Sequence, residues 1–140
     1  MPWFQLIVPA QSLLIKRAHG LVDDEDLGIG VRCLVRHLAG EQVRREICLV
    51  DPGCDFRITP AGLHRALADA QAIARDLGGA PQATVAANDL HFGVARMFAS
   101  LMANFNLRTE VFRSLDEAFG WVNVPVQKID LAAFERVEEP

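Results

Sequence analysis

The sequence lacks the features that would place it in several specialised protein classes. It has three cysteines, Cys33, Cys48 and Cys54, an odd number without C-x-x-C spacing, so neither a disulfide framework nor a zinc knuckle is predicted. Its apolar stretches are too short and too interrupted by polar residues for a membrane span. Residues 4–8 are too few for the core of a signal peptide and follow no basic leader. The expected location is therefore cytoplasmic, with contact at the periphery of a membrane left open.

The sequence also lacks an excess of positive charge and any sign of division into parts. The formal net charge of −4 argues against a general nucleic-acid binder. Internal repeats, low-complexity runs and linkers rich in Ser, Gly or Pro are absent. About half of the 140 residues are hydrophobic, which is enough for a substantial core. We therefore expect one domain, residues 1–140, that does not bind nucleic acid.

The C-terminal half alternates strand and helix signals. Residues 84–87 form a short apolar run, Asn88 is a candidate N-cap, and residues 90–105 repeat at helical spacing. Residues 110–112 then favour a strand. Residues 114–117, Ser-Leu-Asp-Glu, form a capping box, in which the Ser hydroxyl accepts from the Glu amide while the Glu side chain reaches back.

The N-terminal half follows a similar order with strands first. Residues 4–8 and 13–18 are predicted strands, and the acidic residues 23–26 suit the positive end of a helix dipole. Residues 45–50 are the next predicted strand. Thr59 followed by Pro60 is then typical of an N-cap and the first helical position.

This alternation predicts an α/β fold with a mostly parallel, mixed sheet of four to five strands, covered by about four helices. The first strand is expected to be antiparallel at an edge. Residues 130–137 are compatible with a short helix or an extended segment, and the pattern does not choose between them.

Two segments resemble a known family. They are residues 92–98, Phe-Gly-Val-Ala-Arg-Met-Phe, and residues 111–118, Val-Phe-Arg-Ser-Leu-Asp-Glu-Ala, with Trp121 and Val122 after them. They are similar to the helix motif and the closing strand and helix of the SpoIIAA-like branch of the STAS superfamily, which is related to anti-sigma-factor antagonists. The resemblance implies a STAS-like fold and a protein-interaction role. It also implies an architecture shared with CRAL-TRIO lipid-binding domains.

One motif of this family is missing from the sequence. Antagonists of this type carry an Asp-Ser phosphoacceptor at the start of the second helix, followed shortly by Gly-Leu. The matching run here is Thr-Pro-Ala-Gly-Leu, residues 59–63, so the phosphoacceptor position holds Pro60 or Ala61. Neither residue has a hydroxyl, and a switch driven by phosphorylation is not expected.

Candidate ligand-binding residues lie where strands of the predicted sheet end. Ligands of such sheets favour the carboxyl ends of strands, next to helix N-termini that attract anions. This places Asp51, Asn88, His91 and Arg113 together as candidates. The alternative is that the residues at these junctions, such as Asn88 and Ser114, only cap helices.

Catalysis is a remote alternative in the sequence. Cys54 and His91 could meet as nucleophile and base, with Asp51 or Asp55 orienting the imidazole, but no protease-like signature surrounds the cysteine. The Asp and His residues near the strand ends lack any recognised ligand spacing, so no metal and no cofactor are predicted.

The helix over residues 90–105 has two apolar faces. The face expected on the sheet carries Leu90, Val94, Met97, Phe98, Leu101 and Phe105. The opposite face carries Phe92, Ala95, Ala99, Met102 and Ala103. If exposed, this second face would form a homodimer interface or cap a hydrophobic ligand. The alternative is that the last helix and the C-terminal tail cover it.

From these observations we expect a binding protein rather than an enzyme. The favoured ligand is a small hydrophobic molecule or a membrane surface, and a local cluster of Arg32, Arg36, Arg44 and Arg45 would suit anionic headgroups. The alternative is a protein-interaction module of the anti-sigma-factor-antagonist type that binds a regulatory protein. A homodimer is expected in either case.

Overall fold

The computed structural model describes residues 2–39, 43–77, 79–105 and 107–137. A six-stranded sheet in the order β7-β6-β4-β2-β1-β8 forms its centre. Its strands are β1 (Trp3–Val8), β2 (Leu13–Ala18), β4 (Arg45–Val50), β6 (Gln82–Ala86), β7 (Thr109–Phe112) and β8 (Glu135–Arg136). The pairs β2–β4, β4–β6 and β6–β7 are parallel, whereas β1 is antiparallel to both β2 and β8.

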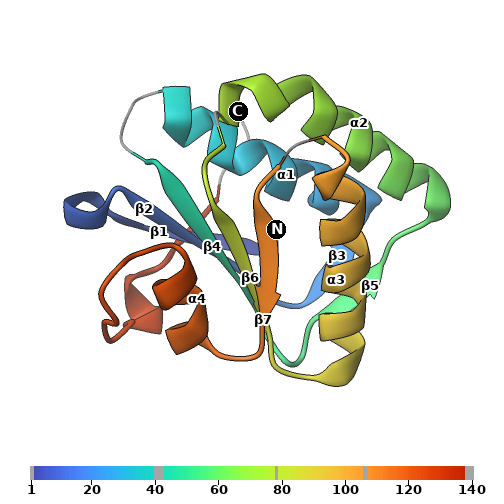
Figure 1. Ribbon diagram of the computed structural model, residues 1–140. Coiled ribbons are helices and arrows are strands. Elements are labelled where there is room, and N and C mark those ends of the chain that lie inside the picture. Colours follow the sequence, from blue (N-terminus) through green and yellow to red (C-terminus); the bar gives the residue numbers. More distant parts are fainter. Residues whose placement is uncertain (1, 40–42, 78, 106, 138–140) are drawn as a thin grey trace.

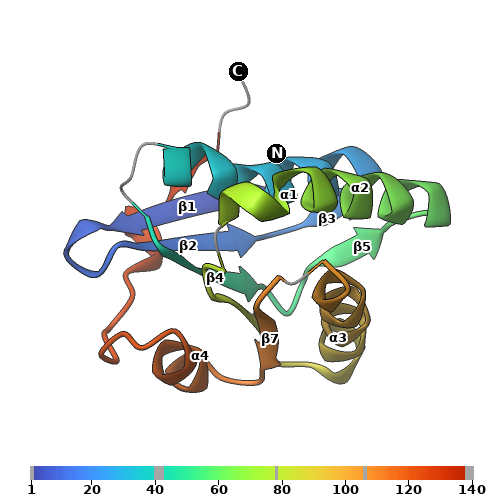
Figure 2. The same ribbon diagram turned by 45° about the horizontal axis from the view of Figure 1, so that its top comes forward.

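Helices cover both faces of this sheet (Figures 1 and 2). Helices α1 (Asp24–Ala39) and α2 (Pro60–Leu77) lie side by side on one face, and α3 (Asp89–Ala103) lies along the β7 edge. The short helix α4 (Leu115–Trp121) and the C-terminal segment cover the other face. A two-stranded parallel sheet of β3 (Leu21–Asp23) and β5 (Asp55–Arg57) links the start of α1 to the start of α2.

The fold class is as the sequence predicts, but the sheet is larger than four to five strands. The extra strand β8 has two residues, too few for any alternation of apolar and polar side chains to reveal it. Its pairing with β1 means that β1, although antiparallel as predicted, is not an edge strand. Residues 130–137 contain both structures left open, a single 3-10 turn at Leu131–Ala133 and then β8.

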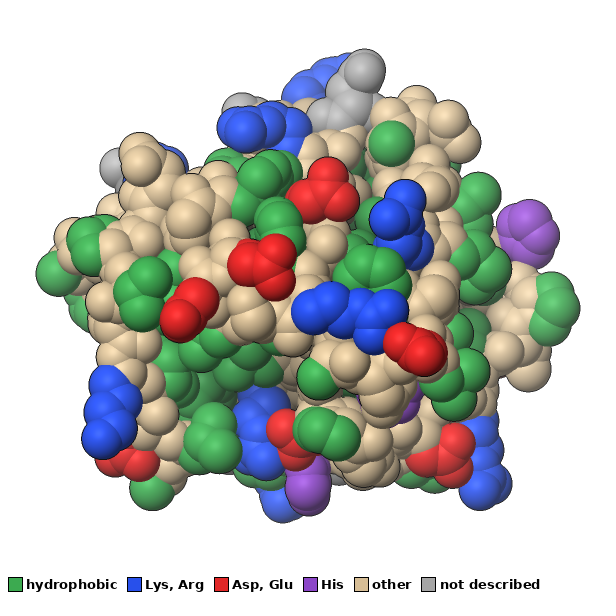
Figure 3. Space-filling view, turned by 60° about the horizontal axis from the view of Figure 1, so that its bottom comes forward, with side chains coloured by type: hydrophobic (Ala, Val, Ile, Leu, Met, Phe, Trp, Pro, Cys, Tyr) green, Lys and Arg blue, Asp and Glu red, His purple; other side chains and the backbone are tan. Residues whose placement is uncertain are grey.

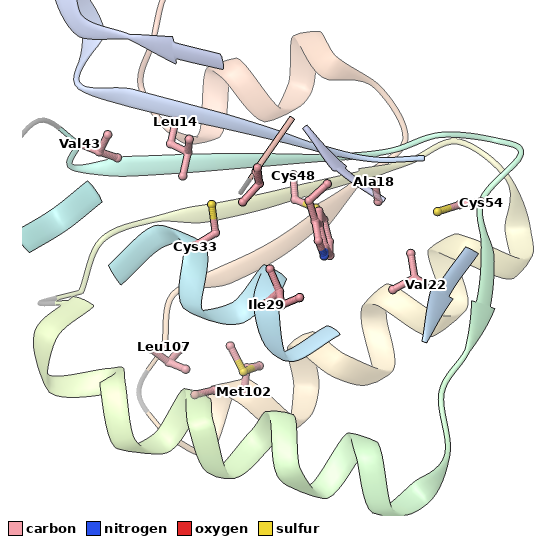
Figure 4. Close-up of a cluster of buried hydrophobic side chains, with 13 residues drawn as sticks. Leu14, Ala18, Val22, Ile29, Cys33, Val43, Cys48, Cys54, Met102 and Leu107 are labelled. Atoms are coloured by element: carbon pink, nitrogen blue, oxygen red, sulfur yellow. The ribbon is translucent and has the colours of Figure 1, made fainter. Parts of the chain in front are cut away.

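Two hydrophobic cores lie between the sheet and the elements that cover its two faces. Strand β2 lies at the middle of the sheet, and Leu13, Leu14 and Ile15 are fully buried because both faces of the strand are covered. Leu13 and Ile15 pack toward α4, where Phe119 is fully buried. Leu14 belongs to the larger core on the other face, which Figure 4 shows with Ile29 and Cys33 of α1, Cys48 of β4 and Met102 of α3.

The predicted caps form at the starts of three helices. The Asn88 side chain accepts from the His91 amide at 2.8 Å, and the Thr59 hydroxyl accepts from the Gly62 amide at 3.0 Å. The Ser114 hydroxyl accepts from the Glu117 amide at 3.3 Å. The carboxylate of Glu117 accepts a hydrogen bond from that hydroxyl at 3.0 Å. Local hydrogen bonding therefore sets these helix starts, as the spacing indicated.

The orientation of α3 differs in part from the prediction, since Phe98 and Phe105 pack against the core as expected but other residues do not. Leu90 and Met97, expected against the sheet, are 73% and 50% exposed. Met102, placed on the opposite face as an interface residue, is only 4% exposed and belongs to the core. His91 is also 4% exposed, so the buried face runs through His91, Ala95, Phe98 and Met102 at helical spacing. Both faces of the helix are apolar, and the periodicity could not choose between them.

Candidate functional site

The loops at the carboxyl ends of the parallel strands converge, as the sequence predicts. The Asn88 side-chain amide donates to the Pro52 carbonyl at 3.4 Å, and the His91 ring bonds to the Cys54 carbonyl at 2.8 Å. The loop after β4 is therefore joined to the start of α3. On the face in Figure 3, Lys and Arg side chains lie close to Asp and Glu side chains, so charges of both signs are mixed there.

His91 is the buried centre of this convergence. Its Nε2 lies 2.8 Å from the Cys54 carbonyl, which can only accept, so Nε2 carries the proton. Its Nδ1 then accepts from the Asn88 side-chain amide at 3.0 Å. The ring also meets Phe56 edge to face at 5.3 Å between centroids. Both ring nitrogens have hydrogen-bond partners. His91 is therefore neutral and joins two loops, and it is not placed to act as a base.

Asp51 turns toward β2 instead of toward Asn88 and His91. Its two carboxylate oxygens accept from Arg17 at 3.0 and 2.6 Å, and Oδ2 also meets Nδ1 of His19. Burial acts to raise the pKa of the Asp51 carboxyl, but its bonds to Arg17 and His19 outweigh burial, and the pKa is below its ordinary value. Asp51 is therefore a charged partner of β2 side chains.

Arg113 is held at the start of α3. Its guanidinium donates to Asp89 at 2.7 Å and to the Ala87 carbonyl at 3.2 Å. It also lies 4.0 Å from the ring centroid of Phe92, in a cation–π contact. Of the four predicted ligand residues, the structure thus joins Asn88 to His91, while Arg113 and Asp51 have other partners.

The cysteines are not placed as nucleophiles. Burial, together with the nearby Asp51 and Asp55 carboxylates, raises the pKa of the Cys54 thiol to about 11. Burial likewise raises the pKa of Cys48 to about 12. Thiols with such pKa values stay protonated near neutral pH. His91 contacts the Cys54 carbonyl rather than its sulfur, so the two residues do not form a catalytic pair.

Within the described ranges, no group of three or more His, Cys, Asp or Glu side chains is arranged to hold a metal ion. In the same part of the chain, no helix combines the length and the apolar character that a membrane crossing requires.

A cavity of about 440 Å³ lies between the sheet and helices α1, α2 and α3. The sequence did not reveal it as a site. Its walls are mostly apolar and include Ala95, Ala99 and Met102, which we had assigned to a dimer interface. The sequence held one signal: Lys16 and Glu46 stand at inward-facing positions of apolar strands, where charged residues are rare.

Lys16 and Glu46 form a buried ion pair in this cavity. They are 8% and 3% exposed, and Lys16 Nζ lies 3.1 Å from Glu46 Oε1. The ammonium also donates to the Gly30 carbonyl at 2.6 Å and lies 5.3 Å from the centroid of the Trp3 ring. Burial, the largest single effect, lowers the pKa of Lys16, but the Glu46 carboxylate and weaker contributions from other neighbours together outweigh it, and the pKa is raised. Lys16 therefore stays charged.

The start of α2 is tied to the start of α1. Asp24 accepts from the Thr59 amide at 2.7 Å and from the Thr59 hydroxyl at 2.6 Å, and Arg65 lies 3.6 Å from the same carboxylate. A side chain at Gly62 would have its Cβ 2.0 Å from the Asp24 carboxyl, so only glycine fits there. Thr59, Pro60 and Ala61 remain exposed. The Thr59 hydroxyl on this surface is already hydrogen-bonded.

Comparison with known proteins gives a result at the level of the fold. No family model matches the sequence, and no curated protein matches it significantly. The structure is similar to that of the anti-sigma factor antagonist SpoIIAA in its unphosphorylated form. The TM-score is 0.53 and the identity 12%, over 86% of this chain and 97% of that chain. It is also similar to an uncharacterized protein from the DUF3478 family with a SpoIIAA-like fold from Shewanella loihica PV-4. Here the TM-score is 0.45 and the identity 21%, over 79% of this chain and 83% of that chain. The chain thus has the SpoIIAA-like, STAS-type fold that the motif residues predicted.

Proposed function

We propose that this chain is a non-enzymatic regulatory module that acts by binding another protein. The observation that carries the proposal is its SpoIIAA-like architecture, which covers nearly the whole length of an anti-sigma factor antagonist. The sequence alone slightly favoured a hydrophobic ligand or a membrane surface, but the comparison supports the alternative reading more directly. The neutral, doubly bonded His91 and the protonated thiols add support, because they leave no activated nucleophile at the loops.

The exposed start of α2 is the proposed contact surface. In an antagonist whose phosphoacceptor lies there, the kinase must touch that surface. Here Thr59, Pro60 and Ala61 are exposed at a helix start that is hydrogen-bonded to α1 through Asp24. A surface held by such hydrogen bonds loses less conformational entropy on binding than an unconstrained loop.

Binding at this surface is proposed to be constitutive. Pro60 and Ala61 have no hydroxyl, and the Thr59 hydroxyl donates to Asp24 while accepting from the Gly62 amide. Incubation with an antagonist-type serine kinase and ATP should therefore leave the mass of the chain unchanged. Stoichiometric phosphate on Thr59 or Ser114 would contradict a module without a phosphorylation switch.

The partner is tested by cross-linking a tagged chain in its native host and measuring the purified complex by native mass spectrometry. We expect one regulatory protein at a fixed stoichiometry. Ala61→Arg should abolish this complex, while Ala68→Arg, at another exposed alanine further along α2, should leave it intact. A chain recovered only as a free protein would contradict the proposal, and loss with both variants would contradict the assigned surface.

The homodimer stays a prediction, but its interface needs to be reassigned. Met102 is buried in the core, and Ala95 and Ala99 line the cavity inside the monomer. Phe92 lies under the Arg113 guanidinium. The face of α3 that we assigned to a dimer is therefore largely covered by the sheet, α2 and Arg113, although Ala103 is exposed.

A further inference from the structure

The cavity behind α3 has the size and lining of a small-molecule site. Protein interiors are close-packed and contain few voids larger than a water molecule, whereas this one measures about 440 Å³. Pockets for small ligands occupy roughly 300–1,000 Å³ and are mostly apolar with a few polar groups. The exposed Pro60 at the start of α2 and the half-exposed Met97 of α3 both line the cavity. Its opening therefore lies between these two helices.

The floor of the cavity is a polar row on three neighbouring strands. Glu46 of β4 is in register with Gln82 of β6, and Gln82 is in register with Thr109 of β7. All three residues line the cavity. Register partners on adjacent strands point to the same face and lie next to each other. An acid, an amide and a hydroxyl thus stand side by side beneath apolar walls.

Two atoms of this row have unused hydrogen-bonding capacity. The Oε1 oxygen of Glu46 is paired with Lys16, but Oε2 is buried and has no hydrogen-bond partner among the described residues. The same holds for Nε2 of Gln82. Buried polar groups in folded proteins nearly always have partners. An unpaired carboxylate oxygen requires a donor, and an unpaired amide nitrogen requires an acceptor.

We infer that the cavity binds a small apolar molecule whose single polar group is a hydroxyl. The O–H of an alcohol donates to Glu46 Oε2, and its oxygen accepts from the Gln82 amide, so one uncharged group serves both atoms. A carboxylate fits poorly, because it has no donor and brings a second negative charge next to Glu46. An ether accepts but does not donate. The remainder of the molecule lies against the apolar walls, which include Phe98 and Ala99.

This inference goes beyond the proposed function, and its test does not involve the protein partner. The purified full-length chain is titrated with n-decanol, decanoate and decyl methyl ether at slightly alkaline pH. Isothermal titration calorimetry gives affinity and stoichiometry. We expect one n-decanol per chain, and affinities at least about tenfold weaker for the ether and for decanoate, because each leaves Glu46 Oε2 without a donor. Absence of n-decanol binding, or equal affinity for the three compounds, would overturn the inference.

Three variants test where the molecule binds. Ala99→Leu adds side-chain volume inside the cavity and should abolish binding, while Ala103→Leu adds the same volume on the exposed side of α3 and should leave it unchanged. Gln82→Leu removes the amide donor and should weaken both n-decanol and the ether by about tenfold, because the oxygen of each accepts from that amide. Binding of n-decanol to Ala99→Leu at the original affinity would show that the molecule lies elsewhere, and would also overturn the inference.

Discussion

Replacement of Glu46 by leucine should be among the most destabilising single changes in this protein. The substitution removes the carboxylate 3.1 Å from Lys16 Nζ, and the ammonium of this buried residue keeps the Gly30 carbonyl as an acceptor. Removal of one partner of a buried ion pair costs about 3–5 kcal/mol, because the remaining charge is uncompensated. For a domain of this size, that corresponds to a fall in Tm of roughly 10–15 °C.

The assay is urea unfolding followed by far-ultraviolet circular dichroism, with a double variant as control. Lys16→Met combined with Glu46→Leu removes both charges, and an apolar pair in place of a buried ion pair is often neutral or stabilising. We therefore expect the double variant to lie within about 1 kcal/mol of the original chain. A loss below about 1 kcal/mol for Glu46→Leu alone, as is typical of exposed pairs, would refute a buried, compensated charge. A double variant as unstable as Glu46→Leu alone would also refute it.

The pH dependence of stability gives a second test, because it should have opposite signs in the original chain and in Glu46→Leu. In the original chain the pKa of Lys16 lies above its ordinary value of 10.5, so the stability contributed by the pair is complete below pH 10.5 and is lost as the pH rises further. In Glu46→Leu, burial is no longer opposed by Glu46, and the pKa of Lys16 should fall below that of the unfolded chain. The unfolded state then binds more protons, and the stability of the variant should increase as the pH rises toward 10.5. A variant whose stability decreases over this interval would contradict the assignment.

Three further predictions concern the cap of α2, the buried thiol of Cys54 and the packing around two glycines. Thr59→Ala should cost about 1–2 kcal/mol in urea unfolding, because the α2 cap is lost, whereas Thr59→Ser should retain most of the stability. Alkylation of Cys54 by iodoacetamide in the native chain should be slow at neutral pH and accelerate as the pH approaches about 11; fast alkylation at neutral pH would contradict the buried thiol. Gly30→Ala should destabilise the chain by about 1–3 kcal/mol, since its Cβ would lie 2.3 Å from the Trp3 ring. Gly93→Ala in α3 has open space and should be neutral or stabilising by up to about 1 kcal/mol, so equal effects at the two positions would be inconsistent with the packing.

The candidate site was only partly predictable. The rule for parallel sheets predicts that the segment with Asn88 and His91 meets the loop after β4. The hydrogen bonds to Pro52 and Cys54 show that the two do meet. The partners of those side chains do not follow from that rule. Asp51 turns to Arg17, and His91 becomes a buried clip to the Cys54 carbonyl, because each contact joins residues far apart in the sequence.

Local signals in the sequence determined most of the secondary structure. The limits of β2 and β4, the caps at Asn88 and Ser114 and the Pro60 start of α2 depend on neighbouring residues, so spacing and residue type are sufficient to predict them. Together with the motif around residues 92–98, these elements also indicated the STAS-like fold.

Only the tertiary structure decided which apolar face of α3 is buried, where β8 pairs, and that Lys16, Glu46 and Gln82 line one cavity. A helix with two apolar faces has no preferred orientation in its own sequence, and a two-residue strand has no periodicity. The register between β4 and β6 that sets Glu46 beside Gln82 arises when strands separated by all of α2 pair. These features depend on contacts between distant residues, and they form only when the whole chain packs.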